Sequence, residues 1–147
     1  MPYFLAPFIG WVVSGTLKFI INRIRFGSEA KKRMGNGGFP STHTTTIFTP
    51  TMLIGFHEGF FSPVFGLAVA ITYIVIIDAT GLRIAVGKHA TSLNRMVRSM
   101  DLSKEEHEEH RESMGHKKHE VLGGLVLGTI LGYVLHVLWK WLAPMIS

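Results

Sequence analysis

Three long apolar blocks constrain this chain more than any other feature of its sequence. They cover residues 3–21, 60–77 and 121–139; the first contains Lys18 as its single charged residue, and the other two contain no Lys, Arg, Asp or Glu. A helix needs about 20 predominantly apolar residues to cross the roughly 30 Å hydrocarbon core of a bilayer. The sequence therefore predicts an all-α integral membrane protein rather than a soluble domain.

Two further stretches complete the predicted architecture. Residues 39–56 form a more polar block of similar length, which we expect to be a fourth transmembrane helix. The charged stretch 93–114 is typical of an amphipathic surface helix, with Ser103 as its N-cap. The first block is not preceded by a basic residue or followed by a clear cleavage site, which argues against a signal peptide. We expect one membrane-embedded helical bundle over residues 1–147.

The basic residues predict the orientation of the bundle. They gather in two polar stretches, 22–38 and 78–120, which four spans place on the same side of the membrane. The positive-inside rule makes this side cytoplasmic and puts both termini outside. The formal net charge is +5. Because this charge lies between apolar blocks, we expect it to meet lipid phosphate in the bilayer rather than nucleic acid.

A glycine stripe marks one face of the last apolar block. Gly124, Gly128 and Gly132 recur every four residues and permit two helices to approach closely. The stripe could serve packing inside one bundle or form the interface of a homodimer, and both interpretations remain open at this point. The chain contains no cysteine, so disulfides and thiolate ligands are excluded.

The stretch "GNGGFPSTHTTT", Gly35 to Thr46, has the composition of an anion-binding loop. Its glycines allow the backbone to approach an anion, and Ser41 and Thr42 lie where a helix begins and offers N–H groups to phosphate. His43, in the first turn, could give a proton to a leaving oxygen. The alternative is an ordinary Ser/Thr helix cap with an incidental histidine.

Two other pairs of polar residues have a spacing that suits catalysis. His116 and Glu120 are four residues apart, so on a helix they share a face and the carboxylate could prepare the imidazole as a nucleophile or base. Lys18 and Arg25 are two helical turns apart and could hold phosphate oxygens. The alternatives are a solvated surface pair for the first and cations that reach the membrane interface for the second.

More ionisable residues belong to the same membrane side. Asp78, Arg83 and Lys88 follow the third span, and ionisable groups at membrane depth are costly enough to suggest function. Four histidines lie within residues 107–119 and raise the alternative of a zinc site. Their spacing matches no standard metal-binding motif, so we predict no metal site and no cofactor.

Three segments together resemble the type 2 phosphatidic acid phosphatase superfamily, which includes the vanadium-dependent haloperoxidases. They are "KFIINRIRF", "PSTH" and "HKKHE", in the order of the superfamily motifs. The chain departs from the pattern at Phe26, Thr42 and Glu120, which replace Pro, Gly and Asp, and it lacks the Ser-Arg half of the third motif. "GNGGFPSTH", "EGFFSPVFGLAVA", "DATGLRIAVGKHATSLN" and "GHKKHEVLGG" are similar to a divergent membrane branch of the superfamily. The resemblance covers roughly residues 10–135.

The resemblance implies roles for the residues singled out above. His116 would attack phosphorus and form a phosphohistidine, Glu120 would orient it, and His43 would protonate the leaving group without any metal. Arg83 or Lys88 would replace the missing arginine. The implied phosphate-binding residues are Lys18, Arg25, Ser41, Thr42, Asp78, Arg83 and Lys88.

We therefore expect metal-independent hydrolysis of a membrane lipid phosphate, of the phosphatidic acid or polyprenyl phosphate type. A second hypothesis is a non-catalytic membrane protein that binds or transports phospholipid or another anion in the same pocket. A third is a structural membrane module without a ligand.

Overall fold

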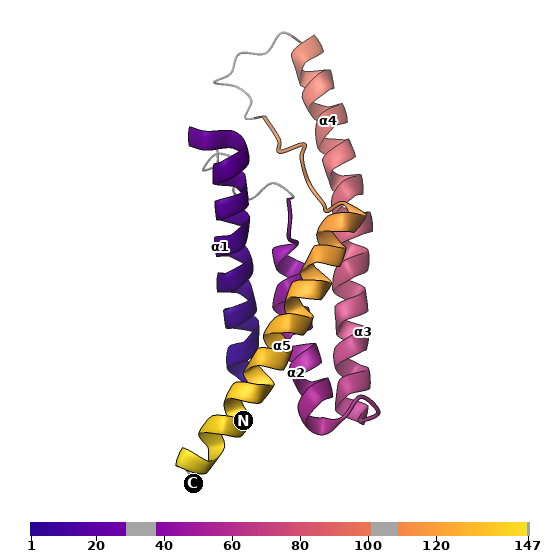
Figure 1. The fold of residues 1–147 in the computed structure, drawn as a ribbon. Helices are drawn as coiled ribbons and strands as arrows, with labels where there is room; N and C mark the ends of the chain where they lie inside the picture. The colour runs from indigo at the N-terminus through magenta and orange to yellow at the C-terminus, as the bar shows by residue number, and fades with distance from the viewer. Residues whose placement is uncertain (29–37, 101–108, 147) are drawn as a thin grey trace.

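The computed structural model describes residues 1–28, 38–100 and 109–146, and these residues form an all-helical fold (Figure 1). This confirms the predicted fold class. The elements in chain order are η1 (Tyr3–Leu5), α1 (Ala6–Phe26), α2 (Thr42–Glu58), α3 (Pro63–Ile77), the π-helical turn η3 (Asp78–Leu82), α4 (Arg83–Ser99) and α5 (Lys118–Ile146).

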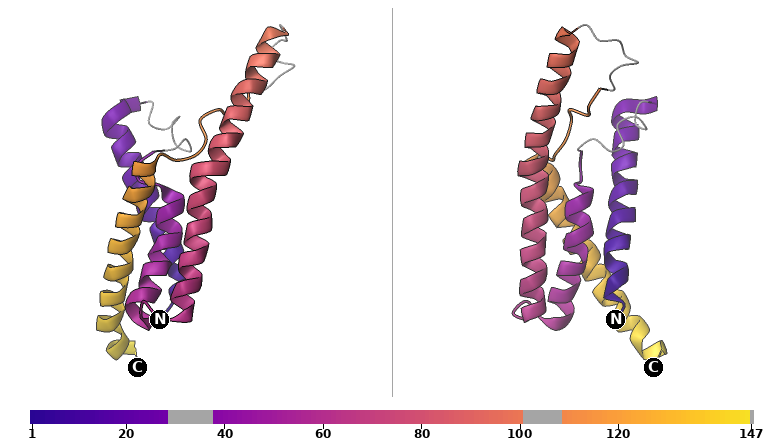
Figure 2. Two further views of the ribbon diagram at one scale, coloured as in Figure 1. Left: turned by 90° about the vertical axis from the view of Figure 1, so that its right-hand side faces the viewer. Right: turned by 180° about the vertical axis from the view of Figure 1, so that it is seen from behind.

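The helix α2 occupies the centre of the bundle and contacts α1, α3 and α5. The chain leaves α1 and enters α5 at the same end of the molecule, beside α4, whereas both termini lie at the other end with the short α2–α3 connection (Figures 1 and 2). The described parts of the two basic stretches therefore share one end, as the sequence predicted.

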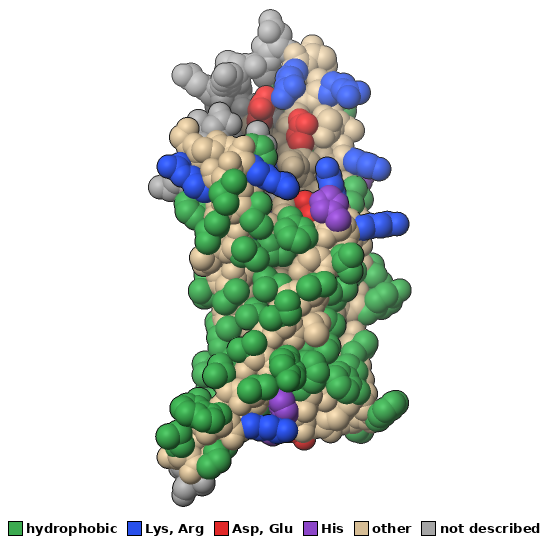
Figure 3. Space-filling view, viewed as in Figure 1, with side chains coloured by type: hydrophobic (Ala, Val, Ile, Leu, Met, Phe, Trp, Pro, Cys, Tyr) green, Lys and Arg blue, Asp and Glu red, His purple; other side chains and the backbone are tan. Residues whose placement is uncertain are grey.

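Among the described residues, three helical stretches have the length and apolarity needed to cross a membrane. They are Tyr3–Phe26, Pro63–Ser99 and Lys118–Met145. The fourth predicted span corresponds to α2, which has 17 residues and packs among the other three. Apolar side chains cover the middle of the molecule in Figure 3, and basic side chains gather mainly at the end that carries α4. The chain is an integral membrane helical bundle.

The interior of the bundle is largely polar. Thr45 and Thr49 are fully buried, and their hydroxyls donate to main-chain oxygens one turn earlier, at 3.0 and 2.8 Å. The hydroxyls of Thr51 on α2 and Thr72 on α3 lie 2.9 Å apart. Because lipid tails are as apolar as leucine side chains, small and hydrogen-bonding residues hold membrane helices together from the inside. This explains why α2 is rich in threonine.

The glycine stripe of α5 packs against α2. A Cβ atom added at Gly124 would lie 2.8 Å from the main-chain oxygen of Ser41, and one added at Gly132 would lie 2.9 Å from the nitrogen of Leu53. Any side chain on this face would therefore collide with the α2 backbone. The stripe serves packing inside the bundle, and a homodimer remains a prediction that must use another face.

The amphipathic helix lies earlier in the chain than predicted. The elements α3, η3 and α4 form one helical stretch, Pro63–Ser99. Its 37 residues exceed the roughly 20 that a bilayer core needs, so the polar α4 extends beyond the bundle (Figure 2). Of the predicted helix 93–114, residues 109–114 are not helical because hydrogen bonds to α4, described below, hold them as an extended segment. Ser103 lies outside the described residues.

The close approach of α2 and α5 predicts that Gly132→Ala destabilises the bundle. The added methyl group meets backbone atoms of α2, and overpacking of this kind costs about 1–3 kcal/mol. Gly66→Ala on α3 is the matched control, because an added Cβ there meets nothing within 4 Å. Thermal unfolding in detergent should show a lower midpoint for Gly132→Ala and no loss for Gly66→Ala. Equal midpoints would contradict the packing described here.

Candidate active site

Ser41 joins the beginning of α2 to the beginning of α5. Its main-chain N–H donates to the carbonyl of Glu120 at 2.9 Å. Its buried hydroxyl accepts from the N–H of Thr44 at 3.3 Å and from the Thr44 hydroxyl at 2.9 Å, as an N-cap does. The cap interpretation thus describes the Ser41 hydroxyl in this structure. The junction places the first turn of α2 next to the residues that precede α5.

This junction brings His43 and His116 together. Their ring centroids are 5.5 Å apart and their planes meet at 78°, edge to face. His43 is exposed, whereas His116 is only 7% exposed and neither of its ring nitrogens has a hydrogen-bond partner among the described residues. A buried imidazole with both nitrogens uncommitted is unusual, because buried polar groups nearly always have partners. Both ring nitrogens of His116 are therefore free of hydrogen bonds to the described part of the protein.

Arg83 connects His43 to Asp78. Its Nη1 lies 3.2 Å from Nε2 of His43, and its Nε donates to Oδ2 of Asp78 at 2.6 Å. A guanidinium group can only donate hydrogen bonds, so Nε2 of His43 accepts and the neutral ring carries its proton on Nδ1. Asp78 and Arg83 are each about a third exposed, so a ligand can reach the pair.

The π-helical turn η3 gives Asp78 and Arg83 their relative position. Residues five apart point to different sides of an α-helix, but the wider π-helical turn stacks them. The sequence predicted both residues for the site because they follow the third span. It did not reveal the π-helical turn that pairs them.

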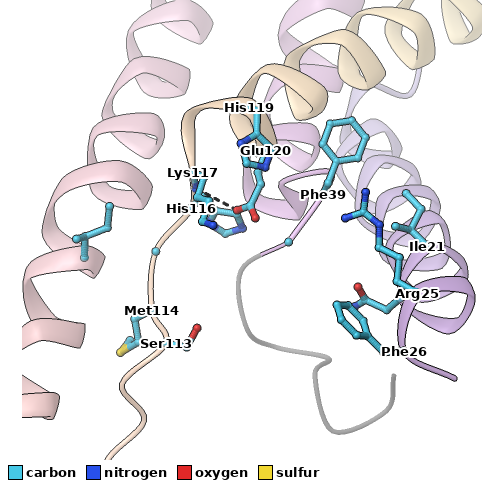
Figure 4. Close-up of a pocket in the computed structure, with 14 residues that line it drawn as sticks. Ile21, Arg25, Phe26, Phe39, Ser113, Met114, His116, Lys117, His119 and Glu120 are labelled. Carbon is cyan, nitrogen blue, oxygen red and sulfur yellow. Dashed lines mark hydrogen bonds between the residues drawn. The ribbon is translucent and has the colours of Figure 1, made fainter. Parts of the chain in front are cut away.

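A cavity of about 550 Å³ opens beside His116 (Figure 4). Asn22 and Arg25 of α1 line one side, and His116 and Glu120 line another. Figure 4 shows Arg25 extending from α1 into the same space. The cavity thus gathers predicted residues from two helices that are far apart in the sequence.

Lys18 lies two helical turns before Arg25 on α1 and does not itself line the cavity. Gly38, at a φ of +138°, packs against it, because a Cβ atom there would lie 3.0 Å from Lys18 Cε. The charge of Lys18 acts on both Glu120 and His116. Gly38 therefore makes room for the side chain of Lys18. Gly35 and Gly37 lie outside the described residues.

Glu120 acts on His116 through its charge. Its Oε2 accepts a hydrogen bond from the main-chain N–H of Lys117 at 3.0 Å, at the start of α5, and makes none with the imidazole (Figure 4). Burial lowers the pKa of His116 to about 4, and the carboxylate of Glu120 opposes this shift. The positive charge of Lys18 lowers the pKa further. His116 is therefore neutral near pH 7, which is the form that can act as a nucleophile.

Two predicted residues lie at the margin of this cluster. Thr42 is the half-buried first residue of α2. Lys88 is exposed on α4 and takes no part in the hydrogen bonds around the two histidines. Of the two candidates for the missing arginine, the structure brings Arg83 to the histidine pair. In the described part of the chain, no group of three or more His, Asp or Glu residues could hold a metal ion.

Asn22 belongs to the site but was missed in the sequence. It is 8% exposed, lines the cavity, and lies four residues after Lys18 and three before Arg25. This helical spacing places all three on one face of α1. A search for polar residues at that spacing would have found it.

Asn94 is a second missed residue, and it holds the segment that leads to His116. Its amide nitrogen donates to the carbonyl of His110 at 2.8 Å and to Oε1 of Glu112 at 2.9 Å, and its oxygen accepts from the N–H of His110 at 2.9 Å. The bond from Asn94 is the main reason that the pKa of Glu112 is lowered. Gly87 admits the segment, since a Cβ there would lie 2.6 Å from the carbonyl oxygen of Glu112.

The same segment ends at the histidine. Gly115 has a φ of +90°, and the N–H of His116 donates to the carbonyl of Ala79 in η3 at 2.9 Å. Residues 109–116 are thus fastened to α4 and η3 at both ends. We name them the strap. No local sequence pattern indicated it, because its partners come from a different helix.

The comparisons with known proteins identify the family of this chain. The family model described as "Divergent PAP2 family" matches residues 1–131. The chain belongs to this family. It is also 26% identical over 136 residues to the uncharacterized membrane protein YuiD of Bacillus subtilis (strain 168), and the match covers 84% of each chain. No solved structure matches the chain. The family resemblance inferred from the motifs is confirmed.

Asn94→Ala should release the strap. The substitution leaves main-chain groups of His110 without their partner, a loss worth about 1–3 kcal/mol. Amide hydrogen exchange should become roughly tenfold faster or more in residues 109–116, while α1 and α2 keep their protection. Ser92→Ala, on the same helix, removes only a local bond to the carbonyl of Lys88 and is the control. Unchanged exchange in Asn94→Ala would contradict the role of Asn94 in holding the strap.

The low pKa of His116 predicts its behaviour in acid. The folded-state pKa is about 4 and the ordinary value is 6.5, so the unfolded chain binds the proton first as the pH falls. His116 therefore reduces the free energy of unfolding progressively between pH 6.5 and about 4, and His116→Gln should lack this contribution. NMR titration of labelled histidines should find one imidazole near 4, and Glu120→Gln should lower that value. Titration of His116 at 6.5 or above would contradict the prediction.

Proposed function

We propose that this member of the Divergent PAP2 family is a metal-independent phosphatase that acts on a membrane lipid phosphate, of the phosphatidic acid or polyprenyl phosphate type. The proposal rests on one observation above all. A neutral, buried His116 faces His43 at 5.5 Å between ring centroids, and Arg83 contacts His43, at the end of the bundle that carries most of the basic side chains (Figure 3).

The first step would be phosphoryl transfer to His116. A nitrogen of the neutral ring attacks phosphorus, and the bond from phosphorus to the lipid oxygen breaks. The incoming phosphate draws Arg83 to its oxygens and favours the protonated form of His43, which gives its proton to the departing oxygen. The products of this step are the lipid alcohol and a phosphohistidine.

Water completes the cycle. The now neutral His43 takes a proton from a water molecule, which attacks the phosphohistidine and releases inorganic phosphate. His116 is again neutral, and His43 again carries the proton that it held with phosphate bound and loses that proton to solvent when phosphate leaves. The net reaction is hydrolysis of one phosphate ester bond. Lys18 and Arg25 supply positive charge from α1 throughout both steps.

By the positive-inside rule, the basic residues at this end of the bundle support a location of this chemistry at the cytoplasmic leaflet. The first turn of α2, which carries His43, and the segment before α5, which carries His116, both lie at this end (Figure 1). A lipid phosphate in that leaflet would meet the site without crossing the bilayer.

One observation favours a second candidate, a phospholipid-binding or transport protein without hydrolysis. Arg83 is already paired with Asp78, and Glu120 bonds to the backbone rather than to His116. Such a site could hold a phosphate group without transferring it. The experiment below separates the two.

Purified protein in nanodiscs should release phosphate from phosphatidic acid or a polyprenyl phosphate. His43→Ala removes the proton donor and should slow release by roughly 100-fold or more. His116→Ala removes the nucleophile and should abolish both release and the acid-labile phosphoprotein. His89→Ala, an exposed histidine on α4, is the matched control and should match the wild type.

The outcomes are distinct. Phosphate release that persists in His116→Ala would refute the phosphohistidine mechanism. If the wild type binds a lipid phosphate tightly and hydrolyses none, the binding and transport hypothesis replaces the enzyme.

A further inference from the structure

A second, apolar groove runs along α5 beside α1. It has a volume of about 440 Å³, and its walls are apolar apart from His119. Three of its residues on α5, Leu122, Val126 and Ile130, are exposed by 61%, 53% and 53%. They lie on the membrane-spanning part of the chain, so their surroundings are lipid. A groove in this position can only be filled by hydrocarbon.

The groove begins at the polar cavity. Phe39 and His119 line both spaces, so the two adjoin without an intervening helix. The ring of Phe39 packs directly on α5, because a Cβ atom at Gly123 would lie 2.2 Å from Phe39 Cε2. Figure 4 shows Phe39 beside the cavity that holds Arg25, His116 and Glu120. Phe39 is therefore the boundary between a charged compartment and an apolar one.

The length of the groove corresponds to one leaflet. From His119 to Ile130 the helical rise of 1.5 Å per residue gives about 16 Å. This is close to half of the roughly 30 Å hydrocarbon core. The groove thus starts at the level of the lipid headgroups and ends near the middle of the bilayer.

We propose that this groove binds one hydrocarbon chain of the lipid whose phosphate enters the polar cavity. The inference rests on the proposed function, and it adds how the substrate is selected. The lipid enters sideways from the leaflet, one chain lies along α5, and Phe39 and Gly123 set the junction between chain and headgroup. A second chain of a diacyl lipid stays in the bilayer. Water-soluble phosphate esters lack the chain and bind poorly.

Filling the groove tests this selection. Val126→Trp inserts a large ring at its centre and should lower the ratio of kcat/KM for long-chain phosphatidic acid to that for glycerol 3-phosphate by roughly tenfold or more. Val137→Trp is the matched control. Val137 is 45% exposed, lies on nearly the same face of α5, and does not line the groove. An unchanged ratio in Val126→Trp would overturn the proposal.

A photocrosslinking experiment separates this proposal from the proposed function. Phosphatidic acid with a diazirine on one chain is incorporated into nanodiscs with the wild-type protein, and labelled peptides are mapped. We expect labelling of residues 122–130 that is lost in Val126→Trp and retained in Val137→Trp. This result supports binding of a lipid chain in the groove even if no phosphate is released. In that case only the proposed phosphatase activity is refuted. Equal labelling of all lipid-facing helices would overturn the groove even if phosphate is released.

Discussion

The contact between α2 and α5 is the interaction on which the rest of the structure depends. Glycines on α5 let its backbone lie against α2, and the N–H of Ser41 donates to the carbonyl of Glu120 where both helices begin. Because the two helix starts are fixed together, His43 in the first turn of α2 meets His116 just before α5. The contact between these two helices therefore sets the distance between the imidazoles.

Other contacts then refine the position of each group. The strap fixes the main chain that carries His116, with Asn94 at one end and the carbonyl of Ala79 at the other. The π-helical turn η3 directs Arg83 back toward His43. Burial then keeps His116 neutral among cations. The α2–α5 contact, the π-helical turn η3 and the strap therefore together position the two histidines and Arg83.

Much of this architecture could be predicted from the sequence because membranes impose strong rules. The apolar blocks predicted the spanning helices, and the basic stretches predicted which ends lie together. Spacing of seven residues predicted that Lys18 and Arg25 share a face of α1, and order along the chain predicted the family. The expected helix face shared by His116 and Glu120 is wrong, because α5 begins only at Lys118 and His116 precedes it. The role of Asn94 could not be predicted in this way, because its partners His110 and Glu112 are 16 and 18 residues away and outside its helix.

The sequence by itself determined the fold class and the family, because these depend on composition and on the order of motifs along the chain. The tertiary structure alone decided that the glycine stripe packs against α2, that Arg83 rather than Lys88 reaches His43, and that Glu120 bonds to the backbone. These outcomes depend on how separate helices approach and rotate about their axes. A linear pattern does not encode that rotation, whereas packed side chains and hydrogen bonds between helices fix it.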